Sequence, residues 1–102
     1  MPRIVLCCAA GMSTSMLVNK MKAEAQQRAL ALEIYAVPVA EFERELPNAD
    51  VILLGPQVKY EAARLRELAA RRGRAGAGID MGDYGMMRGA AVLDKALALL
   101  NH

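Results

Sequence analysis

Four short runs of apolar residues, separated by segments with helical periodicity, dominate the hydrophobic pattern of the chain. The runs are Arg3–Cys8, Leu32–Val37, Asp50–Leu54 and Arg74–Ile79, the last loosened by two glycines. The first and third are continuous rather than alternating, which is typical of strands covered on both faces. Apolar residues at helical spacing predict helices over Ser13–Ala29, Val58–Arg72 and Gly89–Leu100, and a short helical turn near Ala40–Glu45. Residues 80–89 are glycine-rich, and we expect a loop there.

The alternation of strands and helices predicts an α/β fold. We expect an open, doubly wound parallel sheet of four strands, ordered 2-1-3-4, with helices on both faces. A chain of 102 residues suits one domain, spanning residues 1–102, and is too short for two independent cores. Ligands bind such sheets at the carboxyl ends of the strands, where the winding reverses between strands 1 and 3. The loops at this position are Cys8–Ser13 and Gly55–Lys59, with Asp80–Gly85 nearby.

Composition and charge exclude several classes of function. Hydrophobic residues make up 55% of the chain, which argues against disorder, and a net charge of +2 gives no indication of nucleic-acid binding. Arginines cluster in one predicted helix and just beyond it, as a solvated face or as a docking patch for an acidic protein or phosphate; they are Arg64, Arg66, Arg71, Arg72 and Arg74. No apolar run approaches the ~20 residues of a membrane span. We therefore expect a cytoplasmic protein whose membrane role, if it has one, comes through a partner.

Two adjacent cysteines end the first predicted strand. Because consecutive strand residues point to opposite faces, the two thiols cannot share a role, and a vicinal disulfide would be strained. We expect Cys7 to be a small buried hydrophobe. Cys8 should instead face the loop of small residues formed by Ala9, Ala10 and Gly11.

The segment after Cys8 has the composition of an anion site. Free backbone amides and the N-terminus of the following helix attract negative charge, and should lower the pKa of a thiol held there. Ser13, Thr14 and Ser15 offer hydroxyls at the rim, although each could equally act only as a helix cap, Ser13 being the plausible N-cap.

A thiolate surrounded by amides is suited to attack on phosphorus. Tyrosine phosphatases use a comparable loop with the pattern C-x5-R, in which the arginine clamps the phosphate. Here the sixth residue after Cys8 is Thr14, and the loop contains no arginine. Asp80 and Asp83 are the nearest candidates for a general acid. Without the arginine clamp, the loop is better suited to hold a phosphoryl group than to hydrolyse it.

The residues around Cys8 closely resemble a known signature. Cys8-Ala-Ala-Gly-Met-Ser-Thr-Ser15 is similar to the C-S-A-G-M-S-T-S motif of IIB components of sugar phosphotransferase systems, in the lactose/cellobiose (chitobiose) family. The segment Ala49–Val58 is similar to the family's N-A-D-V-x-L-L-G-P-Q stretch. Ala9 departs from the serine usual at its position, and Arg88 falls where an acidic residue is expected.

This resemblance implies a phosphotransferase (EC 2.7.1 class) that is itself phosphorylated. Cys8 would take a phosphoryl group from a phosphohistidine of the IIA component. It would pass the group to a sugar, commonly a disaccharide such as cellobiose, chitobiose or lactose, bound by the membrane IIC component. The implied phosphate-binding loop is Ala9, Ala10, Gly11, Met12, Ser13, Thr14 and Ser15, and the implied second loop is Gly55, Pro56 and Gln57, with Tyr60 either a neighbour of that loop or a packing residue. No metal or other cofactor is implied.

Two alternatives remain open at this point. One is a low-molecular-weight tyrosine phosphatase or arsenate reductase, whose fold is similar to the one expected here. The other is a regulatory module, phosphorylated but uncoupled from transport, that binds a regulator through its arginine-rich helix. No long exposed apolar face stands out, which favours a monomer that meets its partners transiently.

Overall fold

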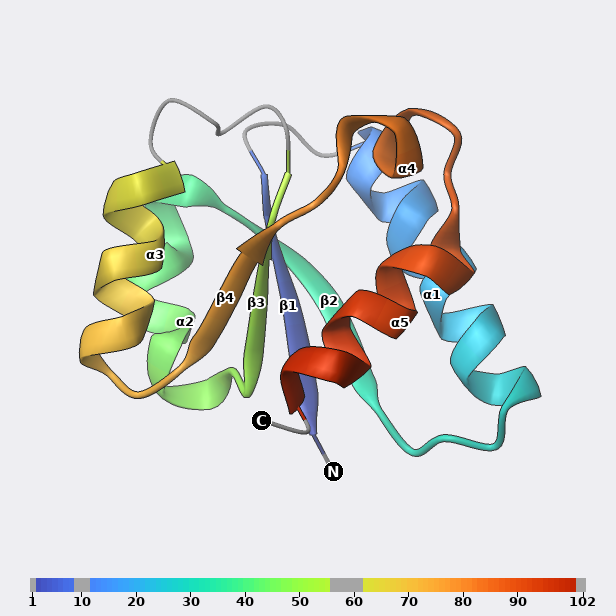
Figure 1. Ribbon diagram of the computed structural model, residues 1–102, viewed down its shortest axis with the longest axis horizontal. Coiled ribbons are helices and arrows are strands. Elements are labelled where there is room, and N and C mark those ends of the chain that lie inside the picture. The colour runs from blue at the N-terminus through green and yellow to red at the C-terminus, as the bar shows by residue number, and fades with distance from the viewer. Residues whose placement is uncertain (1, 9–11, 56–61, 101–102) are drawn as a thin grey trace.

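Four parallel strands form the sheet at the centre of the protein. They are β1 (Arg3–Cys8), β2 (Glu33–Pro38), β3 (Val51–Leu54) and β4 (Ala75–Gly78), in the order β2-β1-β3-β4 (Figure 1). This computed structural model describes residues 2–8, 12–55 and 62–100. The predicted strand order is confirmed, and each predicted strand lies within one residue of the observed bounds.

Helices cover both faces of the sheet, as expected for a doubly wound fold. On one face lie α1 (Met12–Gln27), α4 (Met81–Gly85) and α5 (Gly89–Leu100), and on the other lie α2 (Phe42–Glu45) and α3 (Ala62–Arg71), as Figure 1 shows. Two short 3₁₀ turns flank α2, at Val39–Glu41 and Leu46–Asn48. Together with α2 they form the helical segment predicted near Ala40–Glu45. This segment is longer and less regular than the single turn that was expected.

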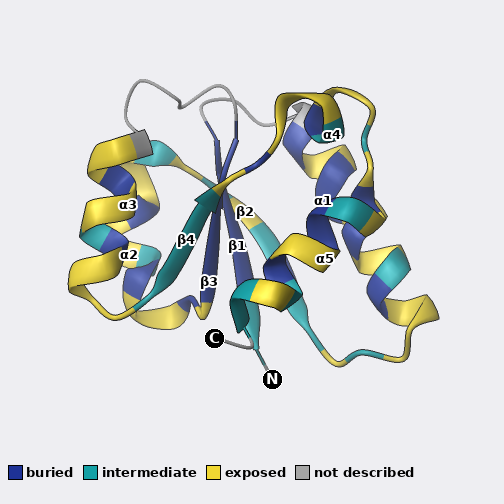
Figure 2. Cartoon of the chain, viewed as in Figure 1, coloured by how far each residue is buried: buried dark blue, intermediate teal, exposed yellow. Residues whose placement is uncertain are grey.

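The sheet separates two hydrophobic cores. The Cys8-side core joins alternate residues of β1 to α1, α4 and α5; its members include Ile4, Leu6, Cys8, Leu17, Met21, Leu53, Tyr84 and Leu93. The Cys7-side core joins the remaining residues of β1 to α2 and α3; its members include Val5, Cys7, Phe42, Leu46, Ile52, Leu54 and Leu65. Both inner strands are dark along their length in the burial view (Figure 2), which explains their continuous apolar sequence.

The bounds of α1 differ from the prediction at both ends. The helix begins at Met12, so Ser13 lies inside its first turn and is not the N-cap. It ends at Gln27 because Ala29 adopts a left-handed backbone conformation, with φ 56°. The amide of Leu30 then donates to the carbonyl of Ala25 at 2.9 Å, which closes the helix end.

The predicted loop over residues 80–89 is wrong, because α4 forms there. Asp80 is its N-cap, and the Asp80 carboxylate accepts a hydrogen bond from the amide of Asp83 at 3.1 Å. The capping bond and the burial of Tyr84 against the core outweigh the poor helix propensity of two glycines.

The helix predicted over Val58–Arg72 is seen as α3, and its expected start at Val58 lies outside the described residues. Gly73, with φ 70°, ends it as predicted. Arg71 pairs with Glu67 of the same helix at 2.8 Å, and Arg74 donates to the carbonyl of Pro47 at 2.9 Å. These contacts, together with the exposure of the other arginines of α3, agree with a solvated helix face.

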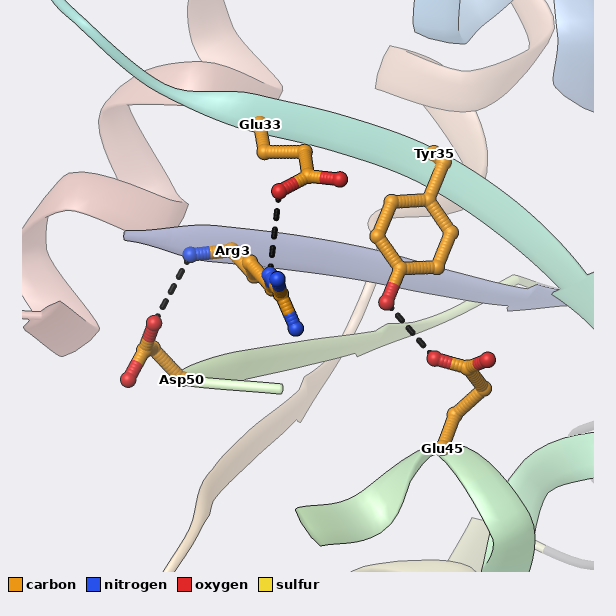
Figure 3. Close-up of polar contacts among 5 residues, drawn as sticks. All are labelled: Arg3, Glu33, Tyr35, Glu45 and Asp50. Carbon is orange, nitrogen blue, oxygen red and sulfur yellow. Dashed lines mark hydrogen bonds and ion pairs between the residues drawn. The ribbon is translucent and has the colours of Figure 1, made fainter. Parts of the chain in front are cut away.

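Polar contacts tie the ends of the strands to their neighbours. The amide and the guanidinium of Arg3 donate to Asp50 at 2.8 Å and to Glu33 at 2.9 Å, joining β1 to both adjacent strands (Figure 3). The hydroxyl of Tyr35 donates to Glu45 at 2.6 Å. Burial, reinforced by this bond to a carboxylate, raises the pKa of Tyr35 to about 12.

None of the helices in the described ranges is both long enough and apolar enough to cross a bilayer.

The close packing of α5 on α1 yields a stability prediction. A methyl group at Gly89 would lie 2.7 Å from Cβ and 2.8 Å from the carbonyl carbon of Lys20, so one helix would have to move. Gly89→Ala should lower the free energy of unfolding in urea by about 1–3 kcal/mol. Gly85→Ala is the control, because nothing lies within 4 Å of its added Cβ, and it should change stability by less than about 0.5 kcal/mol. Equal effects of the two substitutions would contradict this packing.

Candidate functional site

Cys8 lies at the carboxyl end of the central strand, where the winding of the sheet reverses. Strand β1 is flanked by β2 and β3, and Gly55 directly follows β3 at the same edge. The amide of Gly55 donates to the carbonyl of Cys7 at 3.0 Å, which continues the ladder and holds this backbone next to Cys8. Two of the predicted site segments, the ends of β1 and β3, are thus brought together as expected for this fold.

The two cysteines occupy opposite faces, as predicted from strand alternation. Cys7 is fully buried in the Cys7-side core, and Cys8, 3% exposed, belongs to the Cys8-side core. Both thiols are free of disulfides. The adjacent sulfurs therefore have separate surroundings, and only Cys8 lies next to the start of α1.

Burial raises the pKa of the Cys8 thiol, which is opposite to the sequence-based expectation. Removing a thiolate from water disfavours the charged form. Hydrogen bonds from the Thr14 side chain and the Gly55 backbone lower the pKa, but by less than burial raises it. The sequence-based expectation rested on the amides of Ala9, Ala10 and Gly11, which lie outside the described residues, and it did not include the burial of the sulfur.

Thr14 is a buried polar residue in this site rather than a rim hydroxyl. It is 1% exposed, and it is the one buried residue among the Ser, Thr, Asn, Gln and charged side chains whose exposure the structure describes, a set that leaves out Ser13. Its hydroxyl lies 2.9 Å from the hydroxyl of Tyr84, which is 7% exposed. One threonine thus contacts Cys8 on one side and α4 on the other.

Tyr84 is the site residue that sequence reasoning missed. It lies in the segment expected to be a loop, 70 residues from Thr14 along the chain. The available signal was a possible N-cap, Asp80, followed by an aromatic residue at helical spacing. The carboxylates considered as general acids make structural contacts: Asp80 caps α4, and Asp83 lies 3.7 Å from Arg88.

The remaining predicted site residues divide between described and undescribed parts of the chain. Met12 and Ser13 lie in the first turn of α1, Ser15 follows Ser13 by two residues and is exposed, and Gly55 is buried. Ala9, Ala10, Gly11, Pro56, Gln57 and Tyr60 lie outside the described residues. Within the described ranges, no three His, Cys, Asp or Glu side chains gather as they would around a metal ion.

Comparison with known proteins identifies the class to which this fold and thiol site belong. Residues 3–95 match the family described as the lactose/cellobiose-specific IIB subunit of the phosphotransferase system (PTS). A galactose-specific EIIB component from Lactococcus lactis subsp. cremoris is 44% identical over 96% of this chain and 95% of its own. An oligo-beta-mannoside-specific EIIB component from Bacillus subtilis is 38% identical over 98% of this chain and 97% of its own.

A solved structure agrees with these relatives. The cellobiose-specific IIB component from Borrelia burgdorferi superposes with a TM-score of 0.84 at 35% identity, covering 98% of this chain and 92% of that one. The chain belongs to the lactose/cellobiose-specific IIB family of the sugar phosphotransferase system. Members of this family are sugar phosphotransferases, and this protein is accordingly a phosphotransferase.

The raised pKa of Cys8 predicts a characteristic alkylation profile. Iodoacetamide reacts with thiolate, so the modification rate should rise with pH and reach half its maximum above pH 9.0, the ordinary pKa of a thiol. Mass spectrometry should place the modification on Cys8, and Cys7→Ser should leave the profile unchanged. A midpoint below pH 9.0 would show that the donors outweigh burial.

Proposed function

We propose that Cys8 is the phosphocysteine nucleophile through which this protein carries a phosphoryl group to a sugar. The observation that carries this proposal is the position of Cys8. It is the one thiol at the carboxyl edge of the sheet, beside the backbone of Gly55 and the start of α1. Family membership supplies the reaction class, and the position of Cys8 supports its sulfur as the reacting atom.

The reaction has two transfers. In the first, the Cys8 thiolate attacks the phosphorus of a phosphohistidine on the IIA component; the sulfur–phosphorus bond forms as the nitrogen–phosphorus bond breaks, and its electron pair returns to the imidazole. In the second, a sugar hydroxyl oxygen attacks phosphorus and loses its proton, and the thiolate leaves. Cys8 must therefore be a nucleophile in one step and a leaving group in the next.

The segments beside Cys8 are assigned supporting roles on the same basis. We assign residues 9–15 as the phosphate-binding loop, because small residues and the start of α1 provide amides without bulky side chains. We assign Gly55, Pro56 and Gln57, with Tyr60, as the second loop. The absence of arginine between residues 9 and 15 favours a held phosphoryl group over a hydrolysed one.

The sugar is delivered by a membrane IIC component, and we place this carrier in the cytoplasm. The three relatives described above are named for galactose, oligo-beta-mannoside and cellobiose, although all are similar to this chain. This spread supports a IIB component whose sugar is selected by its IIC partner, with a disaccharide such as cellobiose, chitobiose or lactose as the expected class.

Three exposed methionines mark the surface on which the IIA component would dock. Met16 is 57% exposed on α1, Met81 is 65% exposed at the start of α4, and Met86 is 68% exposed directly after that helix. Thr14 belongs to α1 and Tyr84 to α4, so these thioethers lie on or directly beside the two helices whose hydroxyls meet near Cys8. Flexible apolar side chains suit a partner that docks briefly and leaves. A hollow of about 350 Å³, lined by Met16, Asn19, Lys20 and Ala23, adjoins this surface on α1.

Radiolabel transfer tests the nucleophile. The protein is incubated with labelled phosphoenolpyruvate, the general phosphotransferase proteins and the IIA component, and label on this chain is counted. Cys8→Ser should reduce the label to background, because a hydroxyl does not replace the thiolate. Cys7→Ser is the matched control and should keep full labelling, since that sulfur faces the other core. Label that persists in Cys8→Ser would exclude Cys8 as the phosphorylated residue.

Introducing a negative charge on the methionine surface tests the docking site. Met81→Glu and Met86→Glu should each raise the KM for phosphorylated IIA about 10-fold, with little change in stability, because each places a desolvated charge in an apolar contact. Ala31→Glu, an exposed position between α1 and β2 at the opposite edge of the sheet, is the control and should leave the KM unchanged. Unaltered KM values in all three variants would exclude this surface.

A further inference from the structure

Two buried hydroxyl groups connect Cys8 to α4. Thr14 and Tyr84 are 1% and 7% exposed, and their oxygens lie 2.9 Å apart. Thr14 also hydrogen-bonds to the sulfur of Cys8. We propose that Tyr84 is a positioning residue for the Cys8 thiolate, acting through the hydroxyl of Thr14.

When Cys8 is ionised, the donors and acceptors of Cys8, Thr14 and Tyr84 fix the direction of both hydrogen bonds. A thiolate can only accept, so the single hydroxyl hydrogen of Thr14 must point to the sulfur. The Thr14 oxygen is then left as an acceptor, and the hydroxyl of Tyr84 donates to it. Ionised Cys8 thus orients both hydroxyls, and each donated bond strengthens the next in a site away from water.

No other group in the same core can replace this arrangement. Among the described residues of the Cys8-side core there is no charged side chain, and its titratable groups are Cys8 and Tyr84. The charged residues in and next to α4 are Asp80, Asp83 and Arg88. Asp80 caps the helix, and Asp83 pairs with Arg88. Tyr84 therefore acts on the thiolate through a hydrogen bond and not through a neighbouring charge.

The effect should serve both transfers proposed above. A donor that stabilises the thiolate increases its population before attack, and makes it a better leaving group when the sugar accepts the phosphoryl group. The inference rests on the proposed function for its role in transfer. The hydrogen bonds and their influence on ionisation of Cys8 do not depend on that function.

Alkylation of Cys8 as a function of pH tests the inference without any partner protein. Tyr84→Phe keeps the ring in the core and removes only the hydroxyl. Its midpoint should move upward by roughly 0.5–1 pH unit, which is a three- to tenfold lower rate at neutral pH. Thr14→Val should shift the midpoint at least as far, and Thr14→Ser should restore it.

Two comparisons separate positioning from a general effect on structure. Tyr84→Phe combined with Thr14→Val should behave as Thr14→Val alone, because Tyr84 acts through Thr14. Tyr35→Phe is the matched control: it removes a tyrosine hydroxyl that bonds Glu45 in the other layer, and it should leave the midpoint unchanged. A wild-type midpoint in Tyr84→Phe, or additive shifts in the double variant, would overturn the proposal.

Phosphoryl transfer from IIA then distinguishes the two proposals. Tyr84→Phe should slow labelling of Cys8 three- to tenfold with the KM for IIA unchanged. If the midpoint shifts as expected but the wild-type protein accepts no label on Cys8, the proposed function fails and the positioning role stands. If the wild-type protein accepts label and the midpoint does not move, the proposed function stands and the positioning role fails.

Discussion

The alternation of side chains along β1 is the constraint on which the other features depend. This strand lies between β2 and β3 and is covered on both faces. Successive residues therefore point alternately into the Cys8-side core and the Cys7-side core. A shift of one residue in its register would exchange Cys7 and Cys8 between those cores. The hydrophobic packing that fixes the register of β1 therefore also determines which sulfur lies beside Thr14. The same packing stabilises the fold and places the thiol of the site.

Burial and hydrogen bonding act on Cys8 in opposite directions. The helices that exclude water raise the pKa of the thiol, and donors from Thr14 and Gly55 recover part of the stability of the thiolate. Each donor comes from a different element, because Gly55 follows β3 and Thr14 belongs to α1. Tyr84 adds a third element, α4, whose position is fixed by an aspartate cap. The site is thus assembled by tertiary contacts around a sulfur placed by secondary structure.

Much of this architecture could be predicted from the sequence, for identifiable reasons. Continuous apolar runs located the strands, and period-two alternation separated Cys7 from Cys8. The failures occurred where local propensity gave way to tertiary contacts. Glycine-rich residues 80–89 were expected to form a loop, whereas Asp80 and buried Tyr84 stabilise α4. The expected fall in the pKa of Cys8 counted nearby amides but not the burial contributed by residues far along the chain. The Thr14–Tyr84 contact joins positions 70 residues apart, which no local pattern reports.

The placement of the two cysteines on opposite faces also determines how the protein responds to oxidants. A cysteine oxidised to sulfenic acid is commonly rescued by a neighbouring thiol that condenses with it to a disulfide. The chain contains two cysteines, and Cys7 is separated from Cys8 by the thickness of the sheet although it precedes it directly in sequence. Cys8 has no resolving partner within its own chain, so recovery from oxidation depends on thiols supplied by the cell, such as glutathione. The fold protects this sulfur by burying it rather than by providing a means of repair.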